Sequence, residues 1–344
     1  MSAITNFLYN VLNAINNVVG NYGVAIAIFT ILMRAVCMPF DYRSRKGMMR
    51  MAEIQPKIDA LQKKYANDKQ KLQQKQAELM RKEHYSPLSG CLPMLLTWPL
   101  MIAMFAAMRN IANEKLVEQV FRYLTGDENI LTAAERFLWI KNVWITDSPF
   151  APIVPDAASL RAVPREIWQA VFDALTPEQL GIVMQNMNNV ALDFTTNEAM
   201  QQSVSSVLSV LGQMPNYSTY VAVVPGWGKI NFLLFSVTLY QYRNGLLILP
   251  ILAGVTQVLV TKLNPTTNTQ PAQQNQQGAG MNTFMKWFFP ILSIWFCLTS
   301  NAGFAIYWVT SNIFMGVQTV AITKILEKKK AKKNEIVSGE GTVK

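Results

Sequence analysis

The stretch Val24-Ala-Ile-Ala-Ile-Phe-Thr-Ile-Leu-Met33-Arg34-Ala-Val-Cys-Met-Pro-Phe40 places one charged side chain inside an apolar sequence. The stretch approaches the roughly 20 residues that a helix needs to cross a membrane. A charge within such a span costs roughly 2.5–3.5 kcal/mol on insertion scales, so it generally faces a protein interior or a wet cavity and serves function. The alternative is that Arg34 lies near the helix end and extends to lipid headgroups.

Composition extends this interpretation to the whole chain. Of its 344 residues, 51% are hydrophobic and 15% are charged, whereas a typical soluble domain has about 25% charged residues. Four further apolar segments could cross a membrane, namely residues 88–108, 245–263, 284–298 and 303–322. We therefore expect an all-α integral membrane protein, a five-transmembrane-helix bundle with a cytoplasmic helical hairpin and an enlarged extracytoplasmic helical insertion.

The distribution of charge predicts the orientation. Residues 1–33 contain no Lys or Arg, residues 41–86 contain 12 basic and 6 acidic side chains, and residues 110–243 contain 8 basic and 12 acidic ones. The tail after residue 322 contains 7 basic and 3 acidic side chains. Because basic loops stay in the cytoplasm, the N-terminus is expected outside and the C-terminus inside a bacterial plasma membrane. We expect no removable signal peptide.

These patterns predict nine regions along the chain. They are an extracytoplasmic amphipathic helix (1–19), the first transmembrane helix (20–42), a cytoplasmic helical hairpin (43–86), the second transmembrane helix (87–109), an extracytoplasmic region (110–244) with an insertion (146–243), the third transmembrane helix (245–263), a cytoplasmic loop (264–283), the fourth and fifth transmembrane helices (284–324) and a basic cytoplasmic tail (325–344).

Three of these regions have two interpretations each. The apolar face of residues 4–19 suits either the outer membrane surface or packing on the protein itself. The hairpin is either a docking element or a solvated connector, and Pro56 suits the first turn of a helix within it. We expect the tail from Glu327 to be disordered, with its lysines 328–330, 332 and 333 binding either RNA phosphates or anionic lipid.

The sequence argues against an enzyme. His84 is the only histidine, no GxxxxGK[ST] phosphate loop occurs, and none of the five apolar spans contains an acidic residue. The three cysteines form no CxxC pair, so no metal site or disulfide framework is indicated. We expect no cofactor.

Uncharged polar side chains accompany Arg34 in the spans. Thr30 lies one helical turn before Arg34, and Gln257 lies in the third span. In the fifth span Trp308 shares a helix face with Asn312, and Tyr307 shares the adjoining face with Ser311. Such groups commonly form hydrogen bonds between membrane helices. Together with a buried cation they could instead line a wet groove.

An ordered set of segments resembles the YidC/Oxa/Alb family of membrane-protein insertases. The segments that carry the resemblance are Thr30-Ile-Leu-Met-Arg34 with Met38-Pro39-Phe40, Ile54-Gln-Pro-Lys-Ile58 at the head of residues 51–82, Ser86–Leu100, Arg136–Lys141, Ile248–Thr256, Asn264-Pro-Thr-Thr267, Met285–Leu298 and Gly303–Asn312. The insertion at 146–243 matches nothing in that pattern.

The resemblance implies a non-enzymatic insertase and chaperone for membrane proteins. It implies a hydrophilic groove that carries Arg34, with Thr30, Gln257, Tyr307, Trp308 and Asn312 as candidate substrate-contacting residues. The implied partners are nascent membrane proteins, the lipid bilayer and the ribosome through the basic tail, with the Sec translocon and signal-recognition targeting factors as further candidates. The alternatives are a small-molecule or ion transporter or channel, and a non-catalytic assembly scaffold.

Overall fold

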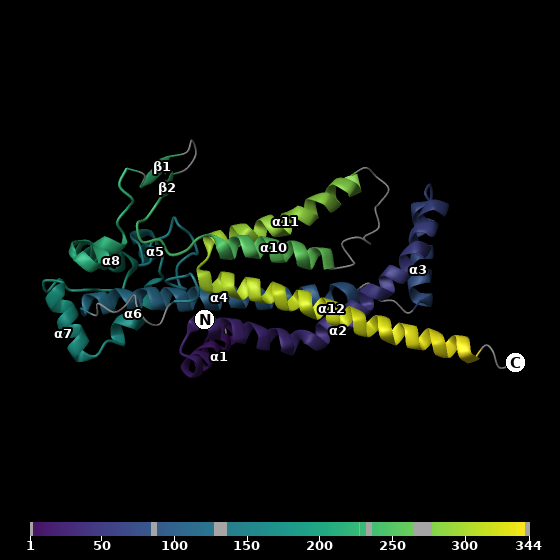
Figure 1. The fold of residues 1–344 in the computed structure, drawn as a ribbon, viewed down its shortest axis with the longest axis horizontal. Coiled ribbons are helices and arrows are strands. Elements are labelled where there is room, and N and C mark those ends of the chain that lie inside the picture. The colour runs from purple at the N-terminus through teal and green to yellow at the C-terminus, as the bar shows by residue number, and fades with distance from the viewer. Residues whose placement is uncertain are drawn as a thin grey trace. The chain divides into compact units, whose positions relative to one another are not determined.

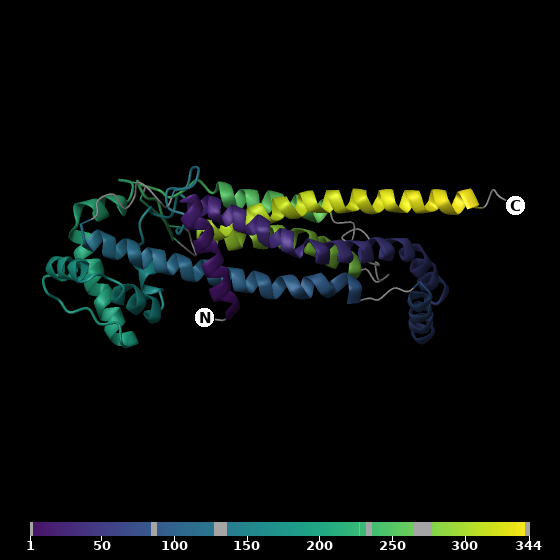
Figure 2. The same ribbon diagram turned by 90° about the horizontal axis from the view of Figure 1, so that it is seen from below.

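The computed structural model describes residues 3–83, 88–126, 136–226, 228–231, 236–263 and 277–340. These residues form mostly helices (Figures 1 and 2), namely α1 (Ala3–Val19), α2 (Tyr22–Lys64), α3 (Lys69–Lys82), α4 (Leu88–Leu124), α5 (Ala157–Arg161), α6 (Arg165–Asp173), α7 (Pro177–Asn186), α8 (Asn197–Gln213), α9 (Pro215–Tyr220), α10 (Ile248–Leu263), α11 (Gln277–Thr299) and α12 (Ala302–Glu340). The antiparallel strands β1 (Lys229–Asn231) and β2 (Ser236–Thr238) pair Ile230 with Val237. Several predicted features fall partly outside the described residues: the hairpin end (84–87), part of the outer region (127–135), most of the cytoplasmic loop (264–276) and the last tail residues (341–344).

The helical content and the apolar helices confirm the coarse prediction of an α-helical membrane protein. Among the described residues, α2 and the Ala302–Lys332 part of α12 are long and apolar enough to cross a membrane. The helix α10 and the Trp287–Thr299 part of α11 are apolar but shorter. The number of spans and their orientation stay predictions.

The chain divides into two compact units. The first unit comprises Met1–Phe29, Ala103–Ala253 and Ser293–Val309, and the second comprises Thr30–Ile102, Gly254–Leu292 and Thr310–Lys344. Five helices contribute residues to both units, namely α2, α4, α10, α11 and α12.

The first unit has an aromatic core in which the insertion packs on α4. Phe121 of α4 contacts Trp168, Phe172 and Phe194, with ring centroids 5.8–6.5 Å apart, and Trp168 stacks on Phe194 at 5.4 Å. Buried aliphatic side chains of α8 complete this core. Burying a side chain of this size contributes roughly 1.5–3 kcal/mol, so the insertion forms a cooperative fold around the end of α4.

A buried carboxylate fixes the start of α10 in the first unit. Asp147 is fully buried and accepts hydrogen bonds from the backbone N–H groups of Leu246 and Leu249, at 2.8 and 2.7 Å. A carboxylate in this position satisfies N–H groups that the first helical turn leaves without partners. A Cβ on Gly245 would lie 1.8 Å from the Asp147 Oδ1 atom, so only glycine fits beside this cap.

The amphipathic helix α1 packs on the protein through one face. Leu8 and Leu12 are buried in the first unit, whereas Ile4, Phe7 and Val18 are exposed. The helix ends at a glycine with a positive φ angle, Gly20, which any other residue would adopt only with strain. The buried face of α1 fits packing on the protein itself. The exposed apolar side chains leave the outer membrane surface as the second interpretation of residues 4–19.

The second unit has apolar side chains outside and polar ones inside. Exposed aliphatic and aromatic side chains occur on α2, α10, α11 and α12, among them Val36, Val255, Trp287, Ile291 and Val317. Buried polar side chains on the same helices include Thr30, Thr256, Ser311, Asn312 and Gln318. Large exposed apolar surfaces are rare in soluble monomers, and this distribution suits a lipid environment.

Two local predictions were wrong. The tail from Glu327 was expected to be disordered, but α12 continues to Glu340, because Lys, Glu and Ala favour helix and because Lys330 pairs with Glu53 of α2 at 2.7 Å. Pro56 was expected in a first helical turn, but it lies inside α2, which continues to Lys64.

Candidate functional site

The Arg34 side chain lies half-buried on α2 in the second unit and faces α12. Its Nε atom donates a hydrogen bond to the Ser311 Oγ atom at 2.7 Å, and a terminal nitrogen donates to the same oxygen. Thr30, one helical turn earlier, is fully buried. Because a hydroxyl is neutral, Ser311 orients the guanidinium without neutralising its charge. The cation therefore remains able to attract an anionic group.

Polar contacts between α2 and α12 recur at one register. The Gln318 Nε2 atom donates to the Asp41 carboxylate at 3.0 Å, and Arg45 donates to the Thr319 hydroxyl. The Arg34–Ser311 and Asp41–Gln318 pairs are both separated by 277 residues, so the two helices run parallel in a fixed register. Seven residues are close to two helical turns, which keeps these contacts on one face.

The third helix of this cluster is α10. The Asn312 Nδ2 atom donates to the Thr256 Oγ1 atom at 3.2 Å, and both residues are buried. Gln257 follows Thr256 and is half-buried. The Thr261 hydroxyl, one turn later, donates to the Gln257 backbone carbonyl at 2.8 Å. The second unit thus contains four of the predicted groove residues, namely Thr30, Arg34, Gln257 and Asn312. Of these, Asn312 is hydrogen-bonded directly to α10.

The two remaining predicted residues belong to the first unit. Tyr307 is buried and packs against Phe304, with ring centroids 6.0 Å apart. Trp308 lies between Phe296 and Phe304, at 6.2 and 5.6 Å. Among the described residues, the buried indole N–H of Trp308 has no hydrogen-bond partner. Both residues therefore contribute aromatic surface, with one polar donor available.

Ser311 was expected only as a polar residue on the face of Tyr307 and not as the partner of Arg34, and Thr256, Asp41 and Gln318 were given no role. Arg34 and Asp41 are seven residues apart, and so are Ser311 and Gln318. This matched spacing of polar residues is a signal that could have identified the α2–α12 contact. Within the described part of the chain, no three His, Cys, Asp or Glu side chains come together as a metal site.

Such an arrangement can bind and guide a polar segment. Arg34 supplies a positive charge, and hydroxyl and amide groups of α2, α10 and α12 supply hydrogen-bonding capacity beside it. Polar groups in an otherwise apolar layer lower the free energy of a polar peptide segment that enters it. The chemistry fits transient binding of a polar, preferentially acidic, chain.

The family described as "60Kd inner membrane protein" matches residues 14–240 and 196–330. A protein of Fusobacterium nucleatum named membrane protein insertase YidC is 34% identical over 138 residues, which are 40% of this chain and 58% of that protein. Its namesake in Clostridium tetani is 37% identical over 114 residues, 32% of this chain and 52% of that protein.

Another similarity extends over nearly the whole chain. The membrane protein insertase YidC of Aliivibrio salmonicida is 23% identical over 326 residues, 95% of this chain and 38% of that protein. The alignments therefore cover between 38% and 58% of these three relatives.

Proposed function

Because the chain belongs to the 60Kd inner membrane protein family, we propose that it inserts other proteins into the bacterial plasma membrane and assists their folding, with no enzymatic reaction. The relatives that carry the name membrane protein insertase YidC support this function. The observation that carries it furthest is Arg34, a cation held by a neutral hydroxyl on α12 and surrounded by helices with exposed apolar faces.

In the proposed mechanism the polar face of the second unit shortens the apolar barrier for a translocated segment. We define this polar face by Thr30, Arg34, Gln257 and Asn312. Arg34 attracts acidic residues of the entering segment, and the neighbouring hydroxyl and amide groups replace part of its hydration. Tyr307 and Trp308 are proposed as aromatic contacts for the client's apolar helix.

The client itself supplies the driving force. Each Leu, Ile, Phe or Val that enters the bilayer centre contributes roughly −0.3 to −0.6 kcal/mol. A membrane potential that is negative inside favours outward movement of negative charge by about 2.3 kcal/mol per charge per 100 mV. These terms are of the size needed to move a short acidic tail, so the protein has to lower a barrier and need not supply energy.

The full topology and the partners belong to the same proposal. Five spans would place residues 110–244 outside and the hairpin (43–86) and tail (325–344) in the cytoplasm. The hairpin would receive clients or targeting factors there, and the tail would bind the ribosome. Cooperation with the Sec translocon is a further part of the proposal.

Reconstitution tests this function. The purified chain, in liposomes without other proteins, should raise the fraction of a single-span client that becomes protease-protected well above that of empty liposomes. Solute or ion flux through the same liposomes without insertion would instead favour a transporter or channel. If the folded protein shows neither insertion nor flux, the result would favour an assembly scaffold.

A further inference from the structure

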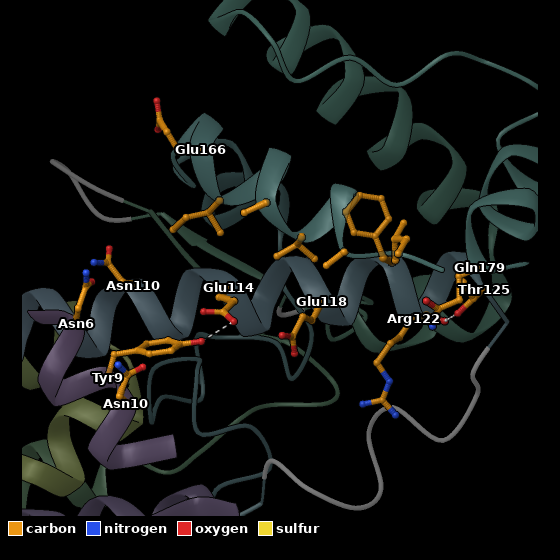
Figure 3. A pocket seen from close by; sticks show the side chains of 16 residues that line it. Asn6, Tyr9, Asn10, Asn110, Glu114, Glu118, Arg122, Thr125, Glu166 and Gln179 are labelled. Carbon is orange, nitrogen blue, oxygen red and sulfur yellow. Dashed lines mark hydrogen bonds between the residues drawn. The ribbon is translucent and has the colours of Figure 1, made fainter. Parts of the chain in front are cut away.

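A large pocket lies in the first unit, and none of the residues that define the polar face line it. It has a volume of about 800 Å³ and lies between α1, α4 and α6 (Figure 3). Ligand-binding pockets in proteins generally measure about 300–1,000 Å³ and combine apolar walls with a few polar groups. The pocket has such walls, and neither the insertion mechanism nor the family resemblance uses it.

The two walls of the pocket differ in chemistry. The α6 wall is largely apolar and includes Ile167, Ala170 and Val171. The opposite wall is formed by α4 and α1, and Figure 3 shows Glu114, Glu118 and Arg122 in succession along α4. A ligand that fills this space must therefore present an aliphatic side toward α6 and a polar side toward α4.

The polar wall favours a cation next to Glu114. The Tyr9 hydroxyl donates to the Glu114 carboxylate at 2.8 Å, and within the described part of the chain Glu114 takes part in no ion pair. Glu118 pairs with Lys115 at 2.7 Å, and Glu166 at the rim pairs with Arg165 at 3.1 Å. Glu114 is thus a half-buried carboxylate that faces the pocket with a neutral partner.

The cost of burial supports this assignment. The pKa of the Glu114 carboxyl is raised, and burial is the largest cause of this shift. The hydrogen bond from the Tyr9 hydroxyl and the charge of Lys115 act in the opposite direction. A buried carboxylate gains most from a cation that approaches within hydrogen-bonding distance. An ammonium or guanidinium at Glu114 would be the natural complement, whereas an acidic group would be repelled.

We propose that the α1–α4–α6 pocket binds a peptide segment that carries a lysine or arginine beside aliphatic residues, and that this segment is the translocated part of a client. The identification of the segment as part of a client rests on the proposed function, which places residues 110–244 on the receiving side of the membrane. Arg34 assists acidic segments, and the pocket retains the segments that Arg34 would repel. The charge next to Glu114 and the apolar α6 wall set this preference together.

Equilibrium binding tests the proposal with the full chain in lipid nanodiscs. The probes are a fluorescent peptide of lysine, leucine and alanine, and a matched peptide in which glutamate replaces lysine. We expect the lysine peptide to bind about tenfold more tightly than the glutamate peptide, and the difference to shrink as salt screens the charge. Equal binding of the two peptides would overturn the proposal.

Two variants locate the site independently. Glu114→Gln keeps an oxygen that can accept from Tyr9 but removes the charge, and Ala170→Trp fills the pocket from an exposed position of α6. Each should weaken binding of the lysine peptide about tenfold. The matched controls, Glu198→Gln and Ala158→Trp, change exposed residues outside the pocket and should bind as the unmodified chain does.

The outcomes separate this proposal from the insertase function. If both pocket variants fold and bind the lysine peptide as the controls do, the pocket is not its site, even where reconstituted insertion succeeds. If the lysine peptide binds at the pocket but does not compete with a client's basic translocated segment, the assignment of the client as the source is overturned. If the purified chain in liposomes without other proteins does not insert the client but still binds the lysine peptide, the result counts against the proposed function alone.

Discussion

Arg34 and Ser311 show how a charge is kept available at the scale of single residues. A carboxylate partner would neutralise the guanidinium, whereas the hydroxyl only orients it. The same helix faces supply neutral partners around it, such as the Asn312–Thr256 pair. The Asp41 carboxylate lies two turns later on the same face and accepts from Gln318, so the direct hydrogen-bond partner of Arg34 is still a neutral hydroxyl.

Replacing Ser311 tests this pairing. Ser311→Ala should lower the free energy of unfolding by about 1.5 kcal/mol, near the lower end for hydrogen bonds to charged groups because Arg34 is half-buried. The measurement is denaturant unfolding in detergent. The control Ser205→Ala removes an exposed hydroxyl that bonds within its own helix. Identical unfolding of the two variants would show that the Arg34–Ser311 contact contributes no stability.

Tyr9 predicts a pH dependence of stability. Burial and the Glu114 carboxylate raise the pKa of Tyr9 from 10.0 to about 12. In the unfolded chain the phenol loses its proton near pH 10, whereas the folded chain keeps it, so stability from this group is full below pH 10 and is lost as pH rises to about 12. Tyr9→Phe should therefore make stability fall less steeply over this range. An unchanged slope in pH-dependent unfolding would contradict the role of Tyr9.

At the scale of elements, the start of α10 depends on a contact that no local pattern reveals. Asp147 precedes α10 by about 100 residues and yet provides its cap. Asn244 adds hydrogen bonds from its side-chain amide to the backbone carbonyls of Asn142, Ile145 and Thr146. These bonds attach the segment before the insertion to the helix after it.

Gly245→Ala tests the closeness of this junction. The new Cβ would overlap Asp147, so we expect a loss of at least about 1–3 kcal/mol, the usual effect of overpacking. Gly212→Ala is the matched control, because nothing lies within 4 Å of a Cβ at this helical glycine and alanine favours helix. Thermal unfolding should separate the two. A Gly245→Ala variant as stable as the control would show that the junction readily rearranges.

The sequence predicts elements well where the environment acts locally. An apolar run such as residues 24–33 specifies a helix because a membrane leaves backbone groups no other partner. The insertion was beyond such reasoning, since its core joins Phe121 to Trp168 and Phe194, residues 47 and 73 positions away along the chain. The continuation of α12 beyond Glu327 was missed because composition alone does not show its contact with α2.

The candidate site was predictable to a similar degree. Arg34 is conspicuous because a charge in an apolar run is unfavourable without a function. Its pairing with Ser311 could not be predicted, because serines in spans are common and the register of α2 against α12 follows only from the folded helix pair. The pocket beside Glu114 requires three helices to be assembled, so no sequence pattern could indicate it.

At the scale of the whole molecule, the basic tail predicts a partner. The tail contacts α2 through Lys329 with the Tyr42 hydroxyl at 3.2 Å and through the Lys330–Glu53 pair. Exposed ion pairs of this kind contribute at most about 1 kcal/mol, so a polyanion can displace them. Deletion of residues 327–344 should weaken co-sedimentation with ribosomes, and the signal of the full chain should fade as salt rises. Unchanged co-sedimentation of the truncated chain would remove the ribosome from the proposed partners.

In the proposed function the charge of Arg34 assists insertion of acidic segments. Its most direct test compares Arg34→Ala and Arg34→Lys in reconstituted liposomes, with a single-span client whose translocated tail is either acidic or neutral. We predict that Arg34→Ala loses insertion of the acidic-tailed client while the neutral-tailed client depends less on residue 34, and that Arg34→Lys retains much of the activity because the ammonium supplies the same charge. An Arg34→Ala protein that folds normally and inserts the acidic-tailed client at the unmodified rate would contradict this role of the Arg34 charge.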